Sequence, residues 1–126
     1  PQKPPGNKSM KLNDPLALSP LTESTYYILI SLVEPLHGYG IIKKVASLSK
    51  GRITLSPGTL YGVLQNLMDH QLISLEQAEQ GGRRKKVYRI TPTGKMLARF
   101  EILRLAEMVS HGRMFLKNAG MGDPDL

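Results

Sequence analysis

The sequence predicts a mainly α-helical fold with one small two-stranded β-hairpin, and three features indicate it. The 126 residues suit a single domain of about 100–150 residues, and 40% of them are apolar although Trp is absent. Apolar residues recur at helical spacing in four segments and alternate in two short ones. Two helix starts are marked by a hydroxyl residue followed by proline, at Ser56-Pro57 and Thr91-Pro92.

The first twenty residues are expected to form a flexible arm. They hold five of the nine prolines and show little apolar periodicity. The chain does not begin with Met, which a vector remnant or processing would explain, and Met10 is a candidate native start.

Two helices are expected to follow the arm. Thr22 can cap a helix that runs through Val33. A second helix should start near His37 or Gly38 and run to about Ser49. The residues expected to face the core are Tyr26, Leu29, Ile30 and Val33 in the first helix, and Ile41, Ile42, Val45 and Leu48 in the second.

The third helix has a strong start signal, because Ser56 is a good N-cap and Pro57 suits the first helical position. Its apolar face consists of Leu60, Val63, Leu64, Leu67 and Met68. Its opposite face carries Thr59, Tyr61, Gly62, Gln65, Asn66 and Asp69. This second face is polar and small, so it suits the base edges of a nucleic acid better than the phosphates.

Alternating residues predict a β-hairpin over residues 73–90. In 73–76 and 87–90 every second residue is apolar, as expected for two half-buried strands. The predicted tip, residues 80–86, holds two glycines and four consecutive cations, Arg83 to Lys86. An isolated two-stranded ribbon is marginal in water, so the hairpin should be a wing on a helical core.

Thr91-Pro92 begins a long helix expected over residues 92–118, with a polar tail over 119–126. Its apolar band is wider than one contact surface requires. Only part of the helix surface, at Arg99, Glu101, Arg104 and His111, is polar and expected to face water. Exposing so much apolar surface to water is unfavourable, so we expect a second subunit to cover this helix. The candidate dimer-interface residues are Met96, Leu97, Phe100, Leu103, Leu105, Met108, Val109 and Phe115.

The positive charge is concentrated in the middle of the chain. The net charge is +7, and nine cations against three anions give +6 between His37 and Arg89. A localised basic field indicates a polyanionic partner, either nucleic acid or an anionic membrane surface. A membrane role would need a basic amphipathic helix, whereas these cations cluster on a hairpin.

Several other classes of function are disfavoured. The absence of Cys excludes disulfides and thiolate chemistry, and His70 and His111 have no ligand-spaced partner, so no metal or other cofactor is expected. No nucleophile–base pair, acid–base carboxylate pair or phosphate-binding glycine motif indicates an enzyme. RNA binding would favour exposed aromatic residues, which are scarce. No segment is long and apolar enough to span a membrane.

The element order, three helices, a basic wing and a long helix, is that of a winged helix-turn-helix domain over residues 21–91 with a dimerisation helix. Three runs resemble the PadR family of bacterial regulators, in the same order and spacing: HGYG at 37–40, GTLYGVLQNLMDHQLI at 58–73 and GRRKKVYRITPTGK at 82–95. The resemblance covers roughly residues 22–117 and is to the short members, which have a single C-terminal helix.

The resemblance implies a dimeric repressor, often of detoxification, efflux or stress genes, released from DNA by a small apolar or phenolic effector. Ser56, Gly58, Thr59 and Tyr61 match the start of the family's recognition helix. Residues 82–86 match its wing tip, and residues 37–39 match the segment that opens its second helix. Gly62 and Asn66 depart from the bulkier or basic residues that are usual in the recognition helix.

The candidate DNA-binding residues are His37, Tyr39, Lys43, Lys44, Ser56, Gly58, Thr59, Tyr61, Gln65, Asn66, Arg83, Arg84, Lys85 and Lys86. The amides of Gln65 and Asn66 can bind adenine, although Asn66 could equally satisfy the local backbone. Tyr61 could contact a phosphate or close the edge of the core. His37 could approach a phosphate at a helix N-terminus or simply pack.

We expect a cytoplasmic, nucleoid-associated homodimer that binds a near-palindromic operator in double-stranded DNA. Its two third helices would lie about 34 Å apart, in successive major grooves. Phe100 and Met108 could line an effector site between subunits, since methionine adapts to irregular ligands, and plain interface core explains both residues as well. A winged helix that binds a protein partner is the alternative function.

Overall fold

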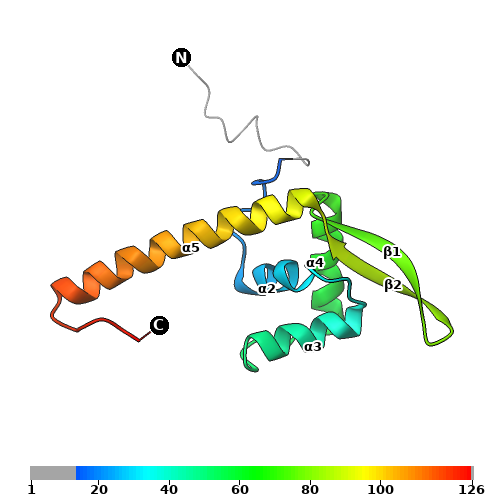
Figure 1. Ribbon diagram of the computed structural model, residues 1–126, viewed down its shortest axis with the longest axis horizontal. Helices are drawn as coiled ribbons and strands as arrows, with labels where there is room; N and C mark the ends of the chain where they lie inside the picture. Colours follow the sequence, from blue (N-terminus) through cyan, green and yellow to red (C-terminus); the bar gives the residue numbers. More distant parts are fainter. Residues whose placement is uncertain (1–13, 126) are drawn as a thin grey trace, which may run out of the picture.

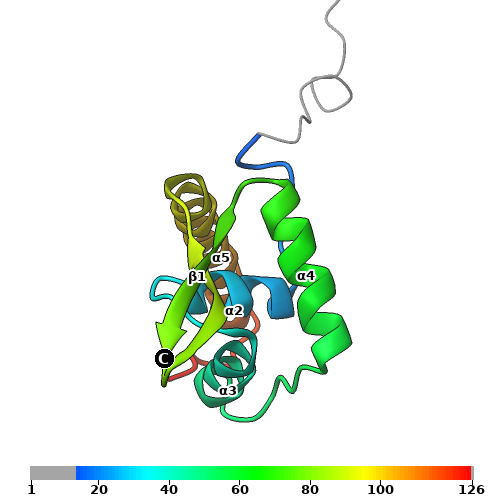
Figure 2. The same cartoon turned by 90° about the vertical axis from the view of Figure 1, so that its right-hand side faces the viewer.

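The computed structural model describes residues 14–125, which form four helices and one antiparallel hairpin (Figures 1 and 2). The elements in order are α2 (Glu23–Ser31), α3 (Gly38–Leu48), α4 (Pro57–Asp69), β1 (Ile73–Gln80), β2 (Arg83–Ile90) and α5 (Pro92–Asn118). The predicted fold class, helical with a two-stranded wing and a long C-terminal helix, is confirmed. No helix in this part of the chain is long and apolar enough to cross a membrane.

Local capping sets where the helices begin. The Ser56 Oγ accepts a hydrogen bond from the Thr59 N–H at 3.2 Å, and the Thr91 Oγ1 accepts one from the Gly94 N–H at 3.0 Å. A proline occupies the first position of both α4 and α5, where no N–H is needed. Both starts therefore lie where the sequence indicated.

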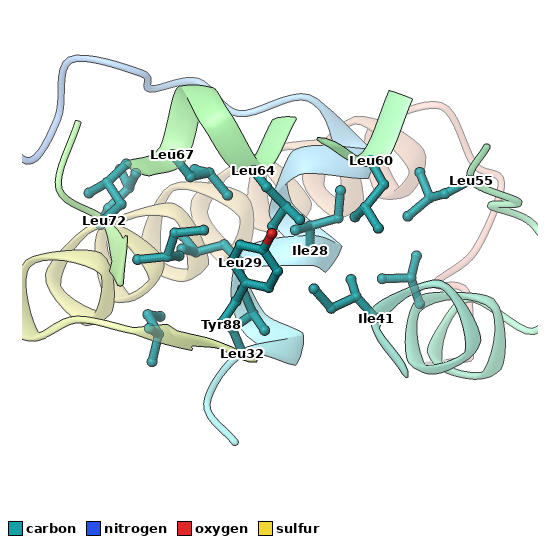
Figure 3. Close-up of a cluster of buried hydrophobic side chains, with 14 of the residues drawn as sticks. Ile28, Leu29, Leu32, Ile41, Leu55, Leu60, Leu64, Leu67, Leu72 and Tyr88 are labelled. Atoms are coloured by element: carbon teal, nitrogen blue, oxygen red, sulfur yellow. The ribbon is translucent and has the colours of Figure 1, made fainter. Parts of the chain in front are cut away.

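The core lies between α2, α3, α4 and the base of the hairpin (Figure 3). Fully buried leucines and isoleucines on α2 and α4 meet here, with Ile41 from α3 and Tyr88 from β2. The buried residues of α2 and α4 shown in Figure 3 are Ile28, Leu29, Leu60, Leu64 and Leu67. Burying a side chain of this size stabilises the fold by roughly 1.5–3 kcal/mol relative to leaving it exposed.

The buried face of α2 differs from the one predicted. The helix ends at Ser31, and the Leu32 N–H bonds the Leu29 carbonyl at 3.2 Å in a tight final turn. This turn buries Leu32 completely and leaves Val33 68% exposed, so the prediction for Val33 is wrong. Leu48, at the last residue of α3, is also exposed, because the core stops short of it.

The wing is longer than predicted. Its strands pair from Ile73–Ile90 to Gln80–Arg83, and a two-residue turn at Gly81 and Gly82 joins them. Both glycines have positive φ, 59° and 78°, as this kind of turn requires. The four cations therefore lie in strand β2 and not in a loop, which corrects the predicted tip over residues 80–86.

The base of the wing is fixed to the helical domain at a second edge. Leu36, between α2 and α3, exchanges backbone hydrogen bonds with Tyr88, and the Ile90 N–H bonds the Leu32 carbonyl at 2.8 Å. Val87 and Tyr88 are both buried here, so simple alternation fails at this end of β2. The hairpin is thus anchored at one end and projects at the other (Figure 1).

Within the described residues, α5 is buried against the domain in its first turns, at Gly94, Leu97 and Glu101. Leu97 is 0% exposed and packs in the protein's own core, so its assignment to a dimer interface is wrong. Glu101, expected to be wet, is 1% exposed. The rest of α5 extends past the domain (Figure 1).

The part of the expected arm that the structure describes, residues 14–20, is attached to the domain. The Ser19 Oγ and the Leu21 N–H both donate to the Glu101 carboxylate, and Leu18 packs against the core. The prediction of a flexible arm is therefore wrong for residues 14–20. Residues 1–13, including Met10, lie outside the described residues.

Candidate nucleic-acid interface

Three elements contribute the predicted DNA-binding residues: the start of α3, the exposed face of α4 and strand β2. Gly38 is buried against Tyr61, and a Cβ on Gly38 would come 2.4 Å from the Tyr61 hydroxyl oxygen. The absence of a side chain at Gly38 therefore leaves room for the Tyr61 ring between α3 and α4. The contact places Tyr39, which is exposed at the start of α3, near the first turns of α4.

The start of α3 forms a shallow surface hollow of about 380 Å³, lined by His37, Tyr39, Gly40, Lys43, Lys44 and Ser47. The Lys43 ammonium lies 5.5 Å from the centroid of the Tyr39 ring, a cation–π contact that holds the charge at the surface. Lys44 instead pairs with Glu34 at 2.9 Å, so its charge is partly neutralised. Lys43 is thus the better placed of the two for a phosphate.

His37 is the N-cap of α3. Its Nδ1 accepts a hydrogen bond from the Gly40 N–H at 3.3 Å, and its ring is partly buried. This contact supports the packing interpretation of His37, because the ring nitrogen already satisfies one of the free amides at the helix start. Ser56 does the same for α4, so its role is also to position a helix.

The exposed face of α4 is polar, small and open. A Cβ on Gly58 or Gly62 would meet nothing within 4 Å, so neither glycine is needed for packing inside this chain. Thr59, Gln65 and Asn66 are exposed on the same helix. Glycine in a helix interior destabilises it by about 1 kcal/mol relative to alanine, and a bare surface lets another backbone approach closely.

One residue that sequence reasoning missed orients Gln65. The Gln65 Nε2 donates to the Asp69 Oδ1 at 2.8 Å, one helical turn away. The second N–H and the carbonyl of the amide remain for a base edge, and this donor and acceptor pair is what adenine recognition needs. The four-residue spacing of Gln and Asp on one helix was the signal that could have indicated it.

The wing presents a row of cations on β2. Arg83, Arg84 and Lys86 are exposed and Lys85 is partly buried, and together they span about 10 Å of strand. Glu79 lies opposite Arg84 in the register. Arg89, at the base, pairs with Glu76 at 3.2 Å. The excess positive charge is therefore toward the tip.

Tyr88 connects the wing to the helices. Burial, and next the nearby Tyr61, raise the pKa of Tyr88 above its ordinary value, so its phenol stays neutral. Tyr61 is itself half exposed, which leaves room for both a contact with Gly38 and a contact outside the chain. The structure thus brings α3, α4 and β2 together around this pair of tyrosines.

The candidate effector residues are not part of this group. Phe100 and Met108 are exposed on α5, about 12 Å apart along the helix axis. The Met108 sulfur lies 3.1 Å from the Arg104 Nη1. Among the described residues, no three His, Cys, Asp or Glu side chains are grouped to hold a metal ion.

Comparisons with known proteins show what this chain is similar to. The transcriptional regulator YqjI of Escherichia coli (strain K12) is 39% identical over 49 residues, which cover 39% of this chain but only 23% of that protein. A PadR family transcriptional regulator from Eggerthella lenta superposes with a TM-score of 0.57 at 28% identity, over 73% of this chain and 79% of that one.

A further structural neighbour is Bacillus subtilis PadR in complex with operator DNA. It has a TM-score of 0.55 and 26% identity, over 62% of this chain and 45% of that one. A family model, the transcriptional regulator PadR-like family, matches residues 28–99, from the core of α2 to the first turns of α5. Because this match spans more than half of the chain, the protein belongs to the transcriptional regulator PadR-like family.

Proposed function

We propose that the protein is a dimeric, sequence-specific DNA-binding repressor of the cytoplasm, associated with the nucleoid. The observation that carries the proposal is the juxtaposition of two surfaces. Helix α4, whose exposed face is largely polar and open, contacts β1 of the wing that follows it, and the cations of this wing are concentrated toward its tip. The neighbour from Bacillus subtilis, which is bound to operator DNA, supports a DNA partner for this fold.

In this proposal α4 enters the major groove. Thr59, Gln65 and Asn66 then face base edges, with Gln65 oriented by Asp69. Lys43 and the wing cations contact phosphates, which fixes the register of the helix in the groove. Each phosphate that is neutralised releases counterions, so the binding should depend strongly on salt.

Dimerisation would use α5. Nine of the sixteen exposed large apolar side chains in residues 14–125 lie on this helix. Between α2 and α5 there is also a groove of about 360 Å³, lined by Ile30, Val33, Ile90, Lys95, Ala98, Arg99, Ile102 and Leu103. We assign this groove and the apolar band of α5 to the α5 of a second copy, which would place two α4 helices about 34 Å apart.

A near-palindromic operator would match the two-fold symmetry of such a dimer. Occupying a promoter would repress transcription. A small apolar or phenolic effector that binds between subunits, near Phe100 and Met108, would favour a different spacing of the two halves and lower the affinity. This last step rests on the family resemblance.

The test is fluorescence anisotropy with the full chain and a duplex from upstream of its own gene. A scrambled duplex of the same length and composition is the control. We expect preference for the native duplex and a steep fall in affinity as salt rises. Equal affinity for both duplexes would contradict sequence-specific binding, and no binding even at low salt would favour the protein-partner alternative.

A further inference from the structure

We propose that Glu101 is a positioning residue that fixes the angle between α5 and the winged-helix domain, and thereby the spacing of the two recognition helices. The part of this inference that concerns DNA rests on the proposed dimeric function. The part that concerns the angle within one chain does not.

Among the described residues, Glu101 is the one charged residue whose side chain is buried. Both oxygens of its carboxylate accept hydrogen bonds. Ser19 Oγ donates to it at 2.7 Å and the Leu21 N–H at 2.8 Å. The Arg104 guanidinium donates through Nε and Nη2, both at 2.9 Å. The carboxylate thus accepts from a chain segment 80 residues away and from its own helix.

The position of these partners makes the contact a connection between elements. Ser19 and Leu21 lie immediately before Thr22, which caps α2, so the carboxylate holds the start of α2 to α5. The buried residues Gly94, Leu97 and Glu101 form one stripe along the first turns of α5. Glu101 is the last of the three, and α5 continues to Asn118 beyond it.

Because α5 is long and is held at one end, a small change in its angle at Glu101 moves its far end by several ångströms. The 17 residues that follow Glu101, up to Asn118, extend the helix by about 25 Å, so a change of about 10° at Glu101 moves the far end by about 4 Å. Without the carboxylate, Gly94 and Leu97 still hold the start of α5 to the domain. Because these two residues lie close together along the helix axis, they constrain the angle of the helix less well. Buried ion pairs are weak evidence for stability and stronger candidates for setting one arrangement over others.

The angle can be measured directly because the chain contains no cysteine. Introduced cysteines at Ser47, exposed on α3, and Lys117, exposed near the end of α5, would carry spin labels for a distance measurement. Excess unlabelled protein ensures that the distance is within one chain. Glu101→Gln removes the charge that Arg104 pairs with, and Glu107→Gln, an exposed position on the same helix, is the matched control.

We expect the distance distribution to broaden or shift by about 4 Å in Glu101→Gln and to be unchanged in Glu107→Gln. Circular dichroism checks that each variant is folded at the temperature used. Ser19→Ala removes one hydrogen bond and retains the ion pair, so it should show a smaller change of the same kind. This variant replaces Glu101→Gln in the distance measurement if Glu101→Gln does not fold. Distributions as narrow and centred as in the unaltered chain would overturn the inference.

The consequence for DNA is tested with operators whose half-sites are moved apart by one and two base pairs. The unaltered protein should bind the natural spacing best, and in Glu101→Gln this preference should fall toward equal affinity at all spacings. A uniform loss at every spacing, or no change, would contradict the positioning role on DNA. If the unaltered protein prefers no duplex, the proposed function fails, while the distance measurement still decides the role of Glu101.

Discussion

Helices α4 and α5 expose opposite kinds of surface. In α4 the apolar residues Leu60, Leu64 and Leu67 are fully buried, and the exposed face is mostly polar residues and glycine, with Tyr61 half exposed. In α5 only the first turns are buried, and beyond Glu101 large apolar side chains such as Phe115 stand in the open. This difference is what the proposed function requires, because a polar open face suits DNA and an apolar band suits another protein surface.

Among the predictions for DNA binding, removing the cations of the wing should have the largest effect. Replacing Arg83, Arg84, Lys85 and Lys86 by Ala should reduce the slope of log affinity against log salt by up to about 3.6 per protomer, since each lost phosphate contact contributes about 0.9. Anisotropy across a salt series measures it. Lys117→Ala on α5 should leave the slope unchanged, and an unchanged slope in the quadruple variant would remove the wing from the interface.

Gly94 tests how α5 is joined to the domain. A Cβ there would lie 2.1 Å from the Leu72 carbonyl oxygen, a backbone atom, so Gly94→Ala should lower the free energy of unfolding by about 3 kcal/mol. Gly112→Ala on the same helix is the control, because a Cβ there meets nothing within 4 Å and alanine favours a helix by about 1 kcal/mol. Urea denaturation should show opposite signs, and equal effects would contradict the tight junction.

Glu101 gives the junction a dependence on pH. Hydrogen bonds from Arg104, Leu21 and Ser19 lower the pKa of Glu101 to about 2 against the opposing effect of burial. Its folded pKa is below its unfolded value of 4.5, so its stabilisation is present above pH 4.5 and is lost as the pH falls toward 2.

Over this pH window the free energy of unfolding should fall by about 2 kcal/mol. This figure is smaller than the full pKa shift would give, because Arg104 is partly exposed and solvent screens its interaction with Glu101. Unfolding by urea at several pH values measures it. The free energy of unfolding of Glu101→Gln should change less with pH over the same range than that of the unaltered chain. Parallel curves for the two proteins would contradict the assignment of this window to Glu101.

Gly62 tests the open face of α4, where the expected effect is smallest. Because a Cβ meets nothing within the chain, Gly62→Ala should stabilise the fold by about 1 kcal/mol. If DNA approaches this face closely, the same change should weaken specific binding. Gly112→Ala should stabilise the fold without affecting the affinity, and unchanged binding by Gly62→Ala would show that DNA does not approach at this position.

Local signals predicted most of the fold and most of the candidate site. Ser56-Pro57 and Thr91-Pro92 place two helix starts because capping involves only neighbouring residues. The cations of β2 and the polar face of α4 were visible as runs and as helical spacing. The strand position of the cations was missed because the two-glycine turn let the pairing extend further than the alternating pattern.

What the sequence concealed depends on contacts between distant segments. The end of α2 is set with the help of the Leu32 carbonyl, which bonds Ile90 far along the chain. The burial of Glu101 depends on Ser19 and Leu21, 82 and 80 residues away, and an isolated glutamate on a helix is normally wet. The sequence alone did not distinguish Leu97 from the interface candidates, because the apolar band of α5 is wider than one contact surface.

Sedimentation velocity with a labelled duplex that carries the preferred upstream site tests whether the chain has one polar surface for DNA and one apolar surface for a second copy. We expect a homodimer in the absence of DNA and a complex of two protomers per duplex. A monomer at micromolar concentration that binds the duplex with one protomer would contradict this expectation.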